Sequence, residues 1–195
     1  MANTIDEIKK ETGTWQRCLA MAGYYPHGEI DGIAGAKTQR AAEQWDKEHA
    51  KIRIQQGELD ERTERNLHTV CPEVAKAVRA WLRDKVNPYC RHAGLVCKVI
   101  EGSRTVAAQN ALGKGVTNAS GGNSFHNYGL AIDIGLFRGN EYLTGDREYR
   151  NLHTVCGDPE GMMWGGNFKS ITDTPHYQIA AYGAGISKVK ALFKK

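Results

Sequence analysis

One short segment, residues 124–133 with the sequence Ser-Phe-His-Asn-Tyr-Gly-Leu-Ala-Ile-Asp, constrains the fold more than any other part of this chain. If it were helical, His126 and Asp133 would lie two turns apart, with a rise of about 10.5 Å between them. Two ligands of one metal ion cannot be that far apart, since each donor atom lies about 2 Å from the ion. A turn at Gly129 followed by a strand removes the difficulty, because glycine permits a sharp bend and a strand alternates its faces. Ala131 and Asp133 then face a site, and apolar side chains face the core: Leu130, Ile132 and Ile134.

A second segment, Asp173-Thr-Pro-His176, is expected to bring further polar groups to the same place. Pro175 biases the residue before it toward extended geometry, so we expect the chain to enter a strand there. His176 and Gln178 then share one face of that strand. Asp173 precedes the strand in a turn, close enough to reach water beside the ion. Two histidines and one aspartate, with a fourth position open, are the ligand set of a catalytic zinc.

The remaining pattern predicts an α+β fold, in which a small antiparallel sheet with flanking helices follows a small all-α N-terminal module. The first 50 residues read as two helices around a turn that contains glycine and proline. Pro72 starts another helix, which Asn87-Pro88 should end or kink. Further helices are expected at 105–112 and 186–195, strands at 95–100, 130–134 and 176–180, and a loop at 113–123. The expected division is a helical module at 1–60, a connector at 61–71 and a catalytic domain at 72–195.

Composition favours a soluble globular protein, with 41% hydrophobic and 25% charged residues. No run of about 18 apolar residues is present, so we expect no membrane insertion. The first residues lack the apolar stretch of a secretory signal. Residues 1–70 hold 10 basic and 12 acidic side chains, whereas residues 71–195 hold 16 and 10. The basic second part suits an anionic partner such as a bacterial wall, but no basic stripe with interleaved aromatic residues indicates nucleic acid.

The cysteines are odd in number and include no Cys-x-x-Cys pair, so we expect reduced thiols packed in the core. They are Cys18, Cys71, Cys90, Cys97 and Cys156.

One heptapeptide, Arg-Asn-Leu-His-Thr-Val-Cys, occurs twice, at 65–71 and at 150–156. Two copies are too few for a solenoid. One interpretation is a zinc site made by two histidines and two cysteines: His68, Cys71, His153 and Cys156. The other is a pair of helix ends that bury the leucine, valine and cysteine of each copy.

The joint pattern resembles the family of zinc D-alanyl-D-alanine carboxypeptidases and L-alanyl-D-glutamate endopeptidases, which includes many phage endolysins. The family pattern is Ser-x-His, then Gly-x-Ala-x-Asp, then Asp or Glu-x-x-His preceded by Trp-Gly-Gly. Here the last element is Trp164-Gly165-Gly166, and the likeness covers residues 72–182. Single pieces of this pattern are weak signals, but their order and spacing together are specific. The resemblance implies a fold of the Hedgehog and D,D-peptidase type.

The resemblance also implies roles for individual residues. One zinc ion is expected on His126, Asp133 and His176. Asp173 is expected to take a proton from the attacking water and to pass it to the leaving amine, and Arg104 to contact substrate or the oxyanion. Substrate contacts are expected from three further residues: Ser124, Trp164 and Gln109. Alternatives are a surface ion pair for Arg104, a turn cap for Ser124 and a core position for Trp164. The chain departs from the family pattern at Asn167 and Gln178, where acidic residues are common.

Residues 12–50 resemble a single peptidoglycan-binding repeat of the small three-helix kind. The likeness rests on the turn Asp31-Gly-Ile-Ala-Gly35 followed by Thr38, in which the aspartate side chain can hydrogen-bond the turn that it starts. Trp45-Asp46 departs from the usual Phe-Gln ending. The alternative is a helical cap that stabilises the enzyme.

These features lead to the hypothesis of an endolysin-like L-alanyl-D-glutamate endopeptidase that acts as a monomer on bacterial peptidoglycan. The missing leader suggests storage in the host cytoplasm until release toward the wall, although a bacterial hydrolase fits the residues equally well. Two other functions stay open: a D,D-carboxypeptidase on the same wall peptides, and a non-catalytic wall-binding or virion protein.

Overall fold

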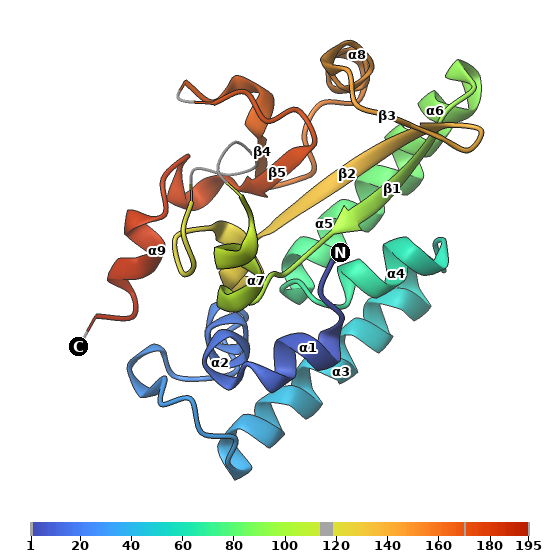
Figure 1. Cartoon of the computed structure of the whole chain (residues 1–195). Coiled ribbons are helices and arrows are strands. Elements are labelled where there is room, and N and C mark those ends of the chain that lie inside the picture. Colours follow the sequence, from blue (N-terminus) through green and yellow to red (C-terminus); the bar gives the residue numbers. More distant parts are fainter. Residues whose placement is uncertain (1, 114–118, 170, 195) are drawn as a thin grey trace.

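An antiparallel sheet forms the centre of the computed structural model, which describes residues 2–113, 119–169 and 171–194. Its strand order is β1-β2-β5-β4, and β3 pairs with the far end of β2. The sheet lies among helices from both ends of the chain (Figure 1), so the expected α+β class is confirmed. The strands are β1 (Val96–Glu101), β2 (Ala131–Arg138), β3 (Glu141–Leu143), β4 (Met162–Trp164) and β5 (His176–Ile179).

Helices form where the sequence carried strong helix signals, such as a proline in the first turn. Pro72 starts α5 in its first turn, as expected. The helices are α1 (Ile5–Lys10), α2 (Thr12–Met21), α3 (Ala36–Gln56), α4 (Glu61–Leu67), α5 (Pro72–Trp81), α6 (Asn87–Ala93), α7 (Val106–Ala111), α8 (Asp146–Cys156) and α9 (Ser187–Ala191). Short 3₁₀ turns are η1 (His27–Glu29), η3 (Phe125–Tyr128), η4 (Gly165–Asn167) and η5 (Ala180–Tyr182).

The expected break at Asn87-Pro88 takes the form of a π-helical turn, η2 (Leu82–Val86), which joins α5 to α6. Proline lacks an N–H and its ring crowds the carbonyl four residues earlier. A π-turn widens the helix at that point and lets it continue. The chain therefore keeps helical direction where the sequence suggested an end or a kink.

The N-terminal helices pack into the same hydrophobic core as the rest of the chain. Trp15 and Trp45 meet edge to face, with ring centroids 4.9 Å apart, and the Trp45 indole N–H donates to the His68 carbonyl at 3.0 Å. The Glu11 carboxylate accepts the backbone N–H groups of Val106 and Ala107 at 2.6 and 3.0 Å, which caps α7. Figure 1 shows α1, α2 and α3 below the sheet, with α3 running along the lower side of α4. The division at 1–60, 61–71 and 72–195 stays a prediction.

Some elements were not expected from the sequence: α1, β3, α8 and β4. Of the expected loop at 113–123, residues 114–118 lie outside the described residues, and the terminal helix is shorter than 186–195. All five cysteines are free and buried, as expected. Within the described ranges, no helix combines the length and apolar character needed to cross a membrane.

Candidate metal centre and catalytic cleft

Three polar side chains from η3, β2 and β5 meet at one end of the sheet. Asp133 and His176 lie directly opposite each other in the β2–β5 pair, which places their Cβ atoms about 5 Å apart. His126 comes from η3, and Gly129 ends that turn with a φ of 72°. This left-handed conformation suits glycine and sends the chain into β2. The expected turn and strand are therefore both present.

The donor atoms of these residues form a nearly equilateral triangle. The distances are 3.3 Å from His126 Nε2 to His176 Nδ1, 3.0 Å from His176 Nδ1 to Asp133 Oδ1, and 3.3 Å from His126 Nε2 to Asp133 Oδ1. For tetrahedral zinc with bonds of about 2.0 Å, ligand atoms lie about 3.3 Å apart. These residues are the one group of three or more histidine, cysteine or acidic side chains within the described residues that could hold a metal ion. The triangle therefore fits zinc.

The partners of both histidines direct lone pairs toward the centre of this triangle. His126 Nδ1 lies 2.6 Å from the Gly102 carbonyl, which can only accept, so Nδ1 carries the proton and Nε2 is free to bind a cation. His176 Nε2 lies 3.0 Å from Gln178 Oε1, and the Gln178 amide group donates to the Gly183 carbonyl at 2.8 Å. That second bond fixes which end of the amide faces the ring. Partners of this kind set the tautomer and orientation of metal-binding histidines.

Arg104 lies at the edge of the triangle in a network of charges. Its Nε donates to Glu101 at 2.7 Å, its Nη2 lies 2.6 Å from the same carboxylate, and Nη2 is 3.7 Å from Asp133 Oδ2. Glu101 reaches this position because a register shift between Val99 and Glu101 sets it opposite Asp133. Burial lowers the pKa of Arg104, but Glu101 and Asp133 outweigh that effect and raise it. Arg104 is therefore held as a fixed positive charge beside the candidate ligands.

Asp173 also lines the cleft. Burial raises the pKa of its carboxyl, and the negative charge of Asp133 adds to that rise. The Asp173 backbone N–H donates to the Gly165 carbonyl at 3.2 Å. A Cβ at Gly165 would lie 2.6 Å from the Asp173 carbonyl oxygen, so only glycine fits at this close approach. The Trp-Gly-Gly motif therefore positions the loop that carries Asp173.

Ser124 caps η3 and also lines the cleft. Its Oγ accepts the His126 backbone N–H at 3.3 Å, and the Asn127 side chain completes the cap. Asn127 was not singled out from the sequence. Its amide N–H group donates to the Arg104 carbonyl at 2.8 Å, which ties η3 to the segment after β1.

Trp164 and Gln109 are not among the residues that line the cleft. The Trp164 N–H donates to the Thr174 carbonyl at 2.8 Å, and its ring stacks on His153 at 4.1 Å. Gln109 is 1% exposed and accepts from Arg104 Nη1 at 2.7 Å. Gln109 bonds Arg104, which lines the cleft, and Trp164 bonds the residue next to Asp173. Direct contact of either residue with substrate remains a prediction.

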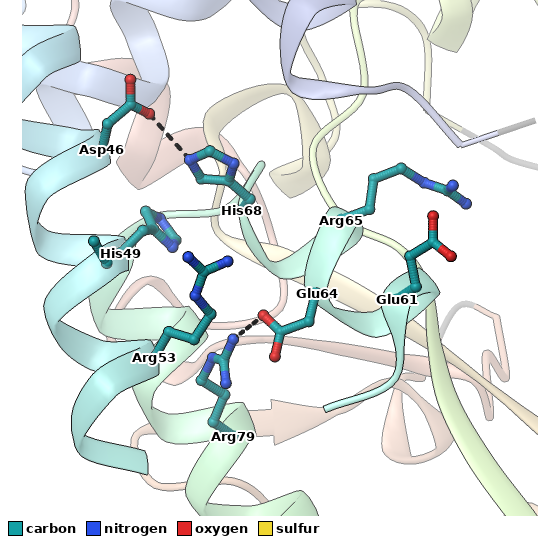
Figure 2. Close-up of a pocket in the computed structure, with 9 residues that line it drawn as sticks. Asp46, His49, Arg53, Glu61, Glu64, Arg65, His68 and Arg79 are labelled. Atoms are coloured by element: carbon teal, nitrogen blue, oxygen red, sulfur yellow. Dashed lines mark hydrogen bonds and ion pairs between the residues drawn. The ribbon is translucent and has the colours of Figure 1, made fainter. Parts of the chain in front are cut away.

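The alternative zinc site in the repeated heptapeptide does not form. His68 faces a separate cavity of about 310 Å³ and bonds Asp46 at 3.0 Å, as Figure 2 shows. His153 bonds Asp158 at 3.1 Å, and the Cys156 thiol contacts the Lys85 carbonyl. The two copies occupy different parts of the fold. The other interpretation, in which each copy is a helix end that buries its leucine, valine and cysteine, is partly right. The leucines and cysteines of both copies are buried, but Val155 is 66% exposed.

The cleft beside the triangle has a volume of about 360 Å³, and its lining includes Glu101, Arg104, Ser124, Phe168 and Asp173. A fixed cation, a half-buried acid and a triangle of metal ligands around one cavity can polarise a carbonyl group and move a proton. No feature of the sequence indicated the role of the Gly102 carbonyl. Gln178 was expected on the same strand face as His176, but its hydrogen bond to that ring was not predicted.

Comparison with known proteins places the chain among cell-wall peptidases. A family model described as D-alanyl-D-alanine carboxypeptidase matches residues 117–179. The peptidoglycan L-alanyl-D-glutamate endopeptidase CwlK of Bacillus subtilis is 30% identical over 131 residues, which cover 58% of this chain and 74% of CwlK. The crystal structure of the Serratia marcescens L-Ala D-Glu endopeptidase ChiX matches with a TM-score of 0.46 and 25% identity, over 65% of this chain and 92% of ChiX. By its similarity to CwlK, the chain belongs to the peptidase family of D-alanyl-D-alanine carboxypeptidases and L-alanyl-D-glutamate endopeptidases.

Proposed function

We propose that this chain is a zinc-dependent peptidase that hydrolyses the L-alanyl-D-glutamate bond in the stem peptides of bacterial peptidoglycan. The observation that carries the proposal is the triangle of His126, Asp133 and His176 donor atoms, with mutual distances of 3.0 to 3.3 Å. Family membership supports peptidase chemistry, and similarity to CwlK supports the choice of bond. Roles as a phage endolysin held in the host cytoplasm, and as a monomer, remain predictions.

Zinc bound at the triangle would act as a Lewis acid toward the scissile carbonyl and would lower the pKa of water there. The protein supplies the remaining chemistry. The Asp173 carboxylate takes a proton from the attacking water and passes it to the leaving amine, and its raised pKa brings it closer to the working pH. Arg104, held by Glu101, supplies a positive charge beside the developing oxyanion. Gln178 and the Gly102 carbonyl hold the histidine rings in the required tautomers.

Digestion of purified sacculi tests the proposal, with the soluble products identified by mass spectrometry. An endopeptidase releases peptides that begin with D-glutamate and leaves L-alanine on the glycan. A D,D-carboxypeptidase, the activity in the description of the matching family model, releases free D-alanine instead. A non-catalytic wall-binding protein sediments with the sacculi and releases nothing.

Two controls connect the products to the site. Chelation should abolish release and added zinc should restore it. Asp173→Asn should abolish release while zinc binding is retained. Release of D-glutamate peptides that persists after complete zinc removal contradicts the zinc-dependent mechanism.

A further inference from the structure

A third cavity, of about 260 Å³, lies where α2, η3 and the C-terminal segment approach one another. Two cationic side chains, two aromatic rings and one aliphatic side chain line it: Arg17, Lys190, Tyr128, Phe193 and Ile30. The rings of Tyr128 and Phe193 lie 5.5 Å apart, and the Arg17 guanidinium lies 5.7 Å from the centre of the Tyr128 ring. We call this the aromatic cavity. None of its lining residues belongs to the candidate metal centre.

Two buried polar atoms lack a hydrogen-bond partner within the part of the chain that the structure describes, one on a residue that lines the aromatic cavity and one on a residue that packs against its Phe193. One is Arg17 Nε, although Nη2 of the same side chain donates to Thr14 at 2.8 Å. The other is Nε2 of His27, whose ring lies 5.0 Å from Phe193. Buried polar atoms in folded proteins are nearly always bonded. Arg17 Nε can only donate, so it favours a bound molecule with an oxygen acceptor beside the apolar ring surface.

Two segments, η3 and residues 186–193, contribute side chains to both the aromatic cavity and the catalytic cleft. Tyr128 follows His126 by two residues in η3, which is about 4 Å along a 3₁₀ axis. Lys190 on α9 donates to the Asn123 side chain at 2.7 Å, and Asn123 itself lines the cleft. Ile186, just before α9, lines the cleft as well. Figure 1 shows α9 beside the segment that leads into η3. Because these two segments line both cavities, we expect one substrate to extend from the cleft toward the aromatic cavity.

The chemistry of the proposed substrate indicates what lies next to the scissile bond. In peptidoglycan, the L-alanine is joined through a lactyl group to an N-acetylated sugar. Two residue lengths span about 7 Å, so this sugar must lie within that distance of the cleaved L-alanyl bond. Its ring has an apolar face that can lie against Phe193 and Tyr128. Its acetamido carbonyl and hydroxyl oxygens are acceptors for Arg17 and Lys190.

We propose that the aromatic cavity binds the N-acetylated amino sugar to which the stem peptide is attached. This inference rests on the proposed function, because it places the substrate's peptide in the cleft. Sites for small molecules commonly combine an apolar lining with a few convergent polar groups, as this cavity does.

Kinetics on two substrates test the proposal. One is the disaccharide tetrapeptide, and the other is the free tetrapeptide that begins with L-alanine and carries no sugar. Phe193→Leu keeps an apolar side chain against Tyr128 but removes the ring, and it should raise KM about tenfold for the disaccharide tetrapeptide only. Leu192→Ala is the matched control, because Leu192 is exposed and does not line the cavity. Equal changes on both substrates, or no change on either, overturn the proposal.

A direct binding experiment tests the sugar site independently of catalysis. The disaccharide of N-acetylglucosamine and N-acetylmuramic acid is titrated into the full chain and followed by NMR, with thermal unfolding of each variant as the folding check. We expect saturable binding that is weakened at least fivefold in Phe193→Leu and Arg17→Met and unchanged in Leu192→Ala. Absence of saturable binding, or full competition by inorganic phosphate, contradicts a sugar site. If the wild-type chain cleaves neither substrate but binds the disaccharide, the proposed function fails and the sugar site stands.

Discussion

Gln178 offers a test of how the protein prepares a histidine for metal binding. In Gln178→Met, the His176 Nε2–H loses its acceptor at 3.0 Å in a buried place. Without metal, the ring can adopt the other tautomer, in which the proton lies on Nδ1 and is donated to Asp133, also 3.0 Å away. With metal bound to Nδ1, the proton cannot move to that atom, and the buried Nε2–H of His176 stays without a partner. The energetic penalty therefore falls mainly on the zinc-bound state.

The size of the effect follows from this difference. A buried, unsatisfied N–H costs about 1–3 kcal/mol. At about 1.4 kcal/mol per factor of ten, the zinc dissociation constant should rise about five- to 150-fold. That range includes the 10- to 100-fold losses typical when a partner of a metal-binding histidine is removed.

The assay is competitive titration of zinc against a chromophoric chelator. Gln178→Glu is the matched control, because a carboxylate still accepts from His176 although it loses the donor to the Gly183 carbonyl at 2.8 Å. It should bind zinc more tightly than Gln178→Met. Histidine NMR of the metal-free protein gives a second readout, in which the proton on His176 shifts toward Nδ1 in Gln178→Met. A wild-type dissociation constant in Gln178→Met would refute the reasoning.

Three further predictions concern other parts of the chain. Asp173→Asn should lower kcat about 10²- to 10⁴-fold and leave the zinc dissociation constant unchanged, because Asp173 is not part of the ligand triangle. Trp164→Phe removes the 2.8 Å bond to the Thr174 carbonyl and should cost about 1–2 kcal/mol in urea unfolding, with a lower kcat. Burial and His68 lower the pKa of His49 to about 3, while its Nε2–H donates to Val70. The unfolded chain binds this proton below about pH 6.5, so stability is lost as pH falls from there toward 3. His49→Gln should lose less Tm between pH 7.5 and 5 than the wild type, and equal losses would contradict this assignment.

The geometry of the metal centre was predictable because it is local. Gly129 and strand alternation decide where Asp133 points, and Pro175 leads into the strand that carries His176. What the sequence did not reveal depends on distant contacts. The register shift that sets Glu101 opposite Asp133 arises from strand pairing and leaves no local signature.

The repeated heptapeptide shows the same limit in another way. Its first copy runs from the end of α4 into the turn before α5, whereas its second lies within α8. Val70 is fully buried, and the equivalent Val155 is 66% exposed. Identical residues therefore adopt different roles because the surrounding core differs, and no pattern within seven residues could distinguish them.

The central claim is that two imidazoles and one carboxylate hold a single zinc ion with one position open. Zinc X-ray absorption on the purified, zinc-loaded chain tests it most directly, together with metal content per chain in the wild type, Asp133→Ala and His176→Ala. We expect one zinc per wild-type chain, with nitrogen and oxygen neighbours at about 2.0–2.1 Å, and at least a 100-fold weaker site in both variants. Zinc that binds with sulfur neighbours, or equally well in all three proteins, would contradict the account.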